Sequence, residues 1–140
     1  HVPDVISEET LETIMKEPGI KETLNYIGNA NLLIYGIGRA DEMSRRRGFS
    51  KEDMDLLERK GAAAEAFGYY FDIDGNVVKR TLTLGVKFEN VKNIGRIVAV
   101  AGGRSKAEAI MSIRTYNKHS VLITDEGAAR GIMSLINGDR

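Results

Sequence analysis

The stretch Val98-Ala-Val-Ala-Gly-Gly-Arg-Ser-Lys106, followed by Ala107-Glu-Ala-Ile110, decides the fold class of this chain. An apolar run rich in β-forming residues ends in two glycines, and a Ser-Lys pair then opens an amphipathic helix. Gly102 and Gly103 let the backbone approach a ligand closely, and the helix start directs unpaired N–H groups at the same spot. With the positive charge of Lys106, this strand–turn–helix unit predicts a phosphate-binding site.

The same residues allow a second interpretation. Ser105 and Glu108 have the spacing of a capping box, in which they satisfy the helix end without any ligand. Arg104 offers one more backbone N–H to a ligand, while its side chain can simply face water. The local sequence leaves the phosphate site and the capping box both open.

Composition excludes several classes of protein. The chain has 140 residues and 42% hydrophobic content, which suits one domain with a real core. Twenty basic and twenty acidic residues cancel, so overall charge gives no reason to expect a nucleic-acid or membrane surface. Cysteine is absent, which excludes disulfides and thiol chemistry and agrees with a cytoplasmic location. Histidine occurs only at His1 and at His119, expected in an exposed loop, so we expect no metal site.

Short apolar runs predict buried parallel strands at residues 32–37, 97–101 and 121–124. Helices are predicted over residues 7–17, 21–27 and 105–115, with another opening at residues 50–53. Pro18-Gly19 should separate the first two helices, and a polar loop should follow the first strand. The last helix should turn its apolar residues inward (Ala128, Ala129, Ile132, Met133 and Ile136). Residues 67–78 read as a small antiparallel hairpin that turns at residues 72–76.

The strand–helix–strand–helix order near the C-terminus predicts an α/β fold. We expect a Rossmann-like, largely parallel sheet with flanking helices on both faces and a small β-hairpin. Ligands of such sheets bind at the carboxyl ends of the strands. Residues 36–39, 102–105 and 124–126 follow the three strands and should therefore converge on one crevice.

Six motifs in order give the chain a family resemblance. It resembles the sugar-binding effector domain of SorC-type bacterial transcriptional regulators, whose fold is related to glucosamine-6-phosphate deaminase and ribose-5-phosphate isomerase. The motifs are Leu33-Ile-Tyr-Gly-Ile-Gly38, Arg46-Arg-Gly-Phe-Ser50, Gly61-Ala-Ala-Ala-Glu-Ala-Phe-Gly68, Phe71-Asp-Ile-Asp-Gly75, Val98-Ala-Val-Ala-Gly-Gly103 and Leu122-Ile-Thr-Asp-Glu126.

The resemblance implies a sensor rather than an enzyme. The members most similar to this chain repress glycolytic genes and respond to fructose-1,6-bisphosphate. Residues 1–140 would be the C-terminal part of a phosphosugar-binding effector domain that self-associates. Operator DNA would be bound by an upstream helix-turn-helix, and a Gly/Thr phosphate loop of the family would also lie upstream. The chain begins without an initiator Met, which agrees with a fragment.

Two further ligand contacts follow from this resemblance. Arg46 lies two residues before Gly48, where the family places an arginine that contacts the effector, and a guanidinium can hold a phosphate through two bonds. The alternative is that residues 45–47 are a solvated run of charge. Glu65 lies in a small, apolar stretch where an unpaired carboxylate is costly, so it either accepts hydrogen bonds from sugar hydroxyls or forms an internal salt bridge.

Other motifs have simpler explanations. Gly38 belongs to an incomplete dinucleotide fingerprint, because Asp41 replaces its third glycine, and is expected at the edge of the sugar site. Asp72 begins a pattern like a calcium loop, but Thr83 stands where the final Glu should be, so a hairpin turn is preferred. Asp125 is expected to cap the last helix.

The sequence leaves three possible functions. The first is phosphosugar sensing without catalysis. The second is a phosphosugar isomerase or deaminase, which needs a general base beside the sugar carbonyl, and no acid–base pair or carboxylate–histidine relay is evident. The third is a purely oligomerising domain, which would leave the Gly102–Lys106 motif unexplained.

Overall fold

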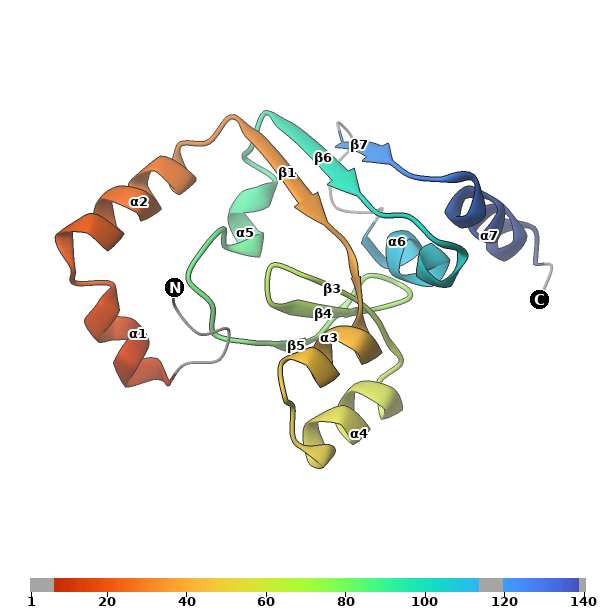
Figure 1. The fold of residues 1–140 in the computed structure, drawn as a ribbon, viewed down its shortest axis with the longest axis horizontal. Coiled ribbons are helices and arrows are strands. Elements are labelled where there is room, and N and C mark those ends of the chain that lie inside the picture. Colours follow the sequence, from red (N-terminus) through yellow and green to blue (C-terminus); the bar gives the residue numbers. More distant parts are fainter. Residues whose placement is uncertain (1–6, 114–119, 139–140) are drawn as a thin grey trace.

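A computed structural model of the chain describes residues 7–113 and 120–138 (Figure 1). The predicted end of the helix beyond residue 113 and the loop with His119 lie outside these ranges. The elements in chain order are α1 (Glu8–Ile14), α2 (Pro18–Gly28), β1 (Leu32–Gly36), β2 (Gly38–Arg39), α3 (Ala40–Arg46), α4 (Lys51–Arg59), β3 (Ala62–Ala66), β4 (Tyr69–Asp72), β5 (Val77–Arg80), α5 (Phe88–Val91), β6 (Arg96–Val100), the 3-10 helix η1 (Arg104–Lys106), α6 (Ala107–Ile113), β7 (Ser120–Ile123) and α7 (Glu126–Asn137).

The three predicted strands form a parallel sheet in the order β1-β6-β7. Leu33 pairs with Ile97 and Tyr35 pairs with Ala99, so these alternate residues share the inner face of the sheet. A cluster that includes α5 and a core that includes α6 cover this inner face. The α/β class and the parallel sheet are therefore confirmed.

The outer face of this sheet differs from the prediction. Ile34 keeps 63% of its surface exposed, whereas Ile97 on the inner face keeps 2%. Leu32, Val100, Val121 and Ile123 are also exposed, and within the described residues no helix covers this face. The prediction of helices on both faces is thus wrong for residues 7–113 and 120–138. Continuous apolar strands are typical of sheets covered on both sides, but the cover cannot be located from the strand itself.

A second sheet is antiparallel and larger than the predicted hairpin, with the order β2-β3-β4-β5. The hairpin of β4 and β5 is confirmed, and Asp72 forms its turn by accepting bonds from the N–H groups of Asp74 and Asn76. The strands β2 and β3 of this sheet and the helix α3 were not predicted. Residues 38–46, expected as loop, form β2 and α3, and the alanine-rich residues 62–66 form β3 instead of remaining unassigned.

The turn between β3 and β4 holds an unusual conformation. Phe67 has a φ of 58° and Gly68 a φ of 82°, so both lie in the left-handed region. That conformation is unfavourable for a bulky residue such as Phe67. Its ring packs 4.6 Å from the ring of Tyr35 on β1, and this contact between the two sheets offsets the backbone strain.

The core lies between the two sheets around α6. It contains Ile37 after β1, Ala64 and Phe71 of the antiparallel sheet, and Ile110 of α6. A smaller cluster on the other side of the antiparallel sheet joins α3 and α4 to Tyr70. The antiparallel sheet is therefore covered on both faces, and α3 is held directly against β3.

The terminal helices pack less deeply than predicted. The break between α1 and α2 lies at residues 15–17, and Pro18, predicted to form it, instead occupies the first turn of α2, where its missing N–H has no helical partner. Neither α1 nor α2 contains a buried residue, and Figure 1 shows both at one end of the molecule. In α7, Ala128 is fully buried, but Met133 and Ile136, predicted to face inward, are exposed.

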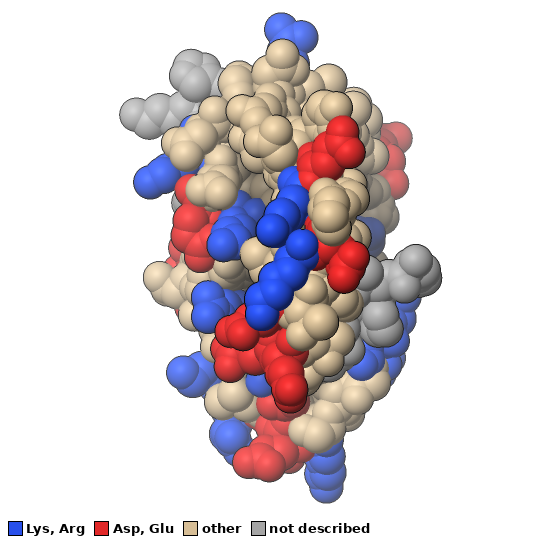
Figure 2. All heavy atoms as spheres, turned by 90° about the vertical axis from the view of Figure 1, so that its left-hand side faces the viewer, with Lys and Arg blue, Asp and Glu red and all other residues tan. Residues whose placement is uncertain are grey.

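The described surface shows mixed charge. On the face in Figure 2, Lys and Arg side chains lie among Asp and Glu side chains, and uncharged residues cover much of the surface. This face therefore carries no large field of one sign. In the described ranges, no helix combines the length and apolar character that a membrane span requires.

Candidate functional site

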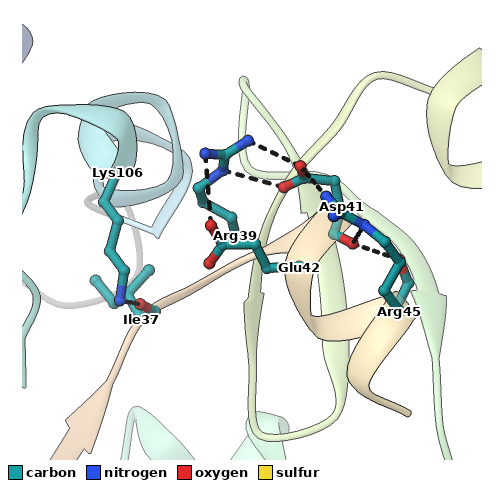
Figure 3. A network of polar contacts seen from close by, with 7 residues as sticks. Ile37, Arg39, Asp41, Glu42, Arg45 and Lys106 are labelled. Atoms are coloured by element: carbon teal, nitrogen blue, oxygen red, sulfur yellow. Dashed lines mark hydrogen bonds and ion pairs between the residues drawn. The ribbon is translucent and has the colours of Figure 1, made fainter. Parts of the chain in front are cut away.

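The loops after the three parallel strands meet, as predicted. The Nζ of Lys106 in η1 donates to the carbonyl oxygen of Ile37, which follows β1, at 3.0 Å (Figure 3). The N–H of Gly103, which follows β6, donates to Asp125 Oδ2, which follows β7, at 2.7 Å. These two bonds bring together the carboxyl ends of all three strands, the edge at which ligands of such sheets bind.

The two glycines have different structural reasons, one steric and one conformational. A Cβ on Gly102 would lie 2.6 Å from Asp125 Oδ2, and Gly103 has a φ of 95°. Asp125 also caps α7 by accepting from the N–H of Ala128 at 2.8 Å, as predicted. The N–H groups of Ala128 and Gly103 hold the pKa of Asp125 below its usual range.

These contacts change the expected phosphate cradle. The N–H of Gly103 already has a partner in Asp125, so the cation of Lys106 is the more available donor. The alternative capping box is not formed, because η1 has no side-chain cap and α6 begins only at Ala107. Arg104 is exposed at the start of η1.

A close contact joins η1 to the last helix. A Cβ added to Gly131 of α7 would lie 2.8 Å from Ala107 Cβ and 3.3 Å from the carbonyl oxygen of Arg104. Only glycine fits here without movement of the neighbouring backbone. The turn that carries Lys106 is therefore packed directly against α7.

Lys106 differs from the other nearby cation in its electrostatic surroundings. Arg39 turns toward the start of α3, where it forms ion pairs with Asp41 at 2.8 Å and Glu42 at 3.5 Å (Figure 3). Arg45 also pairs with Asp41, whose pKa is lowered because these bonds and charges outweigh the opposing effect of desolvation. Within the described ranges, no carboxylate forms an ion pair with Lys106, so its charge remains available.

Glu65 lies beside the same segment. It occupies β3 directly opposite Gly38 of β2, and only 5% of its surface is exposed. Its Oε1 accepts from the N–H of Gly68 at 2.8 Å, and its Oε2 lies 3.5 Å from where a Cβ on Gly38 would be. Gly38 is also crowded by Met43, whose Cγ would lie 2.5 Å from that Cβ.

The arginine that joins this group is Arg47 rather than Arg46. Arg47 NH1 donates to Glu65 Oε1 at 3.0 Å, and their side chains are 10% and 6% exposed. Burial alone would lower the pKa of Arg47, but the charge of Glu65 and the hydroxyl of Tyr70 outweigh it and raise that pKa. Arg46 is exposed, and no hydrogen bond or ion pair joins it to Lys106 or Glu65 in the described structure.

The internal salt bridge considered for Glu65 is therefore present. The sequence offered one usable signal for its partner. Helix α3 has acidic residues in its first turn and basic residues in its last, and Arg47 is its C-cap. Residue spacing alone could not select one arginine from three in a row.

Two other kinds of binding site do not compete with this one in the described structure. A hollow of about 930 Å³ lies between helices α1 and α2 and residues 80–94, but none of the predicted ligand contacts lines it. Within the described residues, no group of His, Asp and Glu has the arrangement of a metal site. The strand-end crevice remains the candidate site.

Comparison with known proteins gives the family. Residues 1–134 match the family model described as "Putative sugar-binding domain". The chain belongs to this family. It is similar to the solved structure of a putative SorC family transcriptional regulator from Enterococcus faecalis, at 42% identity with a TM-score of 0.87, over 95% of this chain and 54% of that one.

Curated members of the family are transcriptional regulators. The central glycolytic genes regulator of Bacillus subtilis is 42% identical over 132 residues, which cover 94% of this chain and 39% of that protein. Transcriptional regulator LsrR of Klebsiella pneumoniae is 32% identical over 141 residues, which cover 94% of this chain and 43% of that protein. The resemblance to SorC-type sugar-binding domains is thus confirmed, and these relatives are regulators rather than enzymes. The chain spans about two fifths of their length.

Proposed function

We propose that this chain is the effector-binding part of a bacterial repressor of glycolytic genes, and that its effector is a phosphorylated sugar, fructose-1,6-bisphosphate above all. Operator DNA would be bound by a separate upstream domain, and the effector domain would self-associate. The 42% identity to a central glycolytic genes regulator supports the class of target gene. The effector itself is argued from the site.

One observation carries the proposal: Lys106 and Glu65 both contact the Ile37–Gly38 segment at the carboxyl end of β1. A phosphorylated sugar offers an anion and hydroxyl groups. The ammonium of Lys106, which forms no ion pair with a described carboxylate, suits the anion, and a carboxylate oxygen suits a hydroxyl donor. This combination favours a sugar phosphate over either a neutral sugar or a free phosphate.

The second phosphate needs a second cation. Arg46 is the predicted anchor, and its exposed guanidinium has no ion pair among the described residues. The backbone of Gly102, Gly103 and Arg104 would also contact the ligand. The Gly103 N–H would then either donate to both Asp125 and the ligand or leave Asp125 to donate to the ligand. Ligand binding would shift the regulator between two arrangements through its different affinity for each.

The test measures thermal stability of the full-length protein with fructose-1,6-bisphosphate, fructose-6-phosphate or inorganic phosphate. A ligand at one hundred times its Kd adds about 2.7 kcal/mol of stability, which is easily detected. Lys106→Ala should weaken binding about 10- to 100-fold because a charge-assisted bond is lost. Lys51→Ala is the matched control, since Lys51 is an exposed first-turn lysine of α4. Equal binding by both variants would refute the assignment of Lys106.

A further inference from the structure

Glu65 has one oxygen fixed and one oxygen open. Its Oε1 accepts two bonds, from the Gly68 N–H and from Arg47 NH1. Its Oε2 has no hydrogen-bond partner among the described residues. Arg47 Nε is the only side-chain polar atom of those residues that is both fully buried and without a partner. Glu65 Oε2 is therefore not fully buried and keeps some contact with solvent. The open oxygen is the one beside Gly38.

The other half of this pair is costly for the fold. Arg47 is nine-tenths buried, and its Nε is sealed from solvent without a partner. A buried ion pair adds little stability over apolar residues of the same volume, and an unpaired buried N–H reduces it further. The Arg47–Glu65 ion pair is therefore better explained by the way it orients the Glu65 carboxylate than by a gain in folding stability.

Helix α3 supplies this direction. It begins next to Gly38 and ends at Arg47, which reaches back to Glu65. Met43, midway along the helix, packs against Gly38. The helix therefore has Gly38 next to its start and the ion-pair partner of Glu65 at its end.

We propose that Arg47 is a positioning residue, which fixes Glu65 Oε1 so that the charged Oε2 faces the effector beside Gly38. This inference rests on the proposed function and names the group that would make the site selective for a sugar phosphate over inorganic phosphate. Arginine suits this role because its rigid guanidinium holds NH1 in a fixed direction, and NH1 contacts both Glu65 Oε1 and the Tyr70 hydroxyl. Lysine would keep the charge and lose that geometry.

The test compares the variants Glu65→Gln, Arg47→Gln, Arg47→Lys and the double variant Arg47→Gln/Glu65→Gln in the full-length protein. Binding of fructose-1,6-bisphosphate and of inorganic phosphate is measured by calorimetry, and folding stability by urea denaturation. Arg59→Gln is the matched control, because Arg59 lies exposed in the last turn of α4.

Each single Gln variant should bind the bisphosphate about 10- to 100-fold more weakly, because a hydrogen bond to a charged group is lost or misdirected. Their binding of inorganic phosphate should change less than threefold, and Arg47→Lys should restore part of the bisphosphate affinity. The double variant should be more stable than either single variant, since no unpaired charge remains buried. Its affinity should nevertheless stay within threefold of that of Glu65→Gln.

Three results would overturn the inference. If affinity recovers together with stability in the double variant, the ion pair is only structural. If Glu65→Gln binds the bisphosphate as the wild type does, Glu65 is not a contact, although the role of Lys106 stands. If the wild-type protein binds none of the sugar phosphates, the proposed function fails and the role of Arg47 fails with it.

Discussion

Replacement of Gly68 by alanine should destabilise the protein well beyond the usual effect of a left-handed glycine. Gly68 has a φ of 82°, and a Cβ there would lie 2.8 Å from Thr81 Oγ1 and 2.9 Å from Thr83 Cγ2. The Thr81 hydroxyl cannot easily move, because it donates to the Gly68 carbonyl at 3.0 Å. The new methyl group therefore meets two side chains that are already in place.

The size of the effect has two parts. An alanine held in the left-handed region costs about 1–2 kcal/mol. Forcing a methyl group into a filled space costs about 1–3 kcal/mol more. We expect Gly68→Ala to lower the free energy of unfolding by about 2–5 kcal/mol in total.

Gly61→Ala separates the two parts. Gly61 has a φ of 64°, and nothing lies within 4 Å of its Cβ position, so only the conformational cost applies. Both variants are compared with wild type by urea denaturation. Adding Thr83→Ala to Gly68→Ala should recover part of the loss, because it removes two close atoms. Equal destabilisation by Gly68→Ala and Gly61→Ala would refute the steric argument.

Two further predictions concern the parallel sheet and the cap of α7. Ile97→Ala should lower the free energy of unfolding by about 2–5 kcal/mol because Ile97 is 2% exposed. Ile34→Ala in residues 1–140 should change it by no more than about 0.5 kcal/mol because Ile34 is 63% exposed. Urea denaturation of both variants checks this, and similar losses would contradict the exposed outer face. Asp125 has a lowered pKa through its bonds to the N–H groups of Ala128 and Gly103, so its contribution to stability is present above the usual value near 3.8 and is lost as pH falls through the lower folded value. The melting temperature of Asp125→Asn should therefore depend less on pH below 5 than that of wild type, and parallel profiles would argue against the cap.

The parallel strands could be predicted because their apolar runs are short and bounded by glycine or polar residues. Burial could not be predicted equally well. Leu32 and Ile34 read as residues of a strand covered on both faces, but the described chain covers only the face of Leu33 and Tyr35. A continuous apolar pattern predicts that both faces of a strand are buried, but it does not identify the segment that packs against each face.

Tertiary contacts explain the elements that the sequence did not predict. Residues 62–66 are mostly alanine, which favours helix, yet pairing with β2 and β4 on either side makes them a central strand. Helix α3 has few apolar residues, but Ala40, Met43 and Ser44 recur at helical spacing and pack inward. That spacing was a usable signal within a strongly charged segment.

The candidate site was predictable to the extent that it follows topology. Lys106 and Asp125 each follow a parallel strand, and the rule for strand ends placed both in one crevice before any contact was known. Arg47 could not be found in this way, because its role depends on which way the chain leaves α3. The direction of the chain after a helix is set by tertiary contacts and cannot be derived from residue spacing.

The glycine at position 131 has a mechanical consequence. Because no methyl group fits between Gly131 and Ala107, the turn that carries Lys106 cannot move closer to the last helix unless the helix also moves. A ligand that moves the backbone of η1 toward α7 would push that helix outward, and the exposed Met133 and Ile136 would move with it. A displacement that begins in the turn after β6 would thus reach an apolar surface on the last helix.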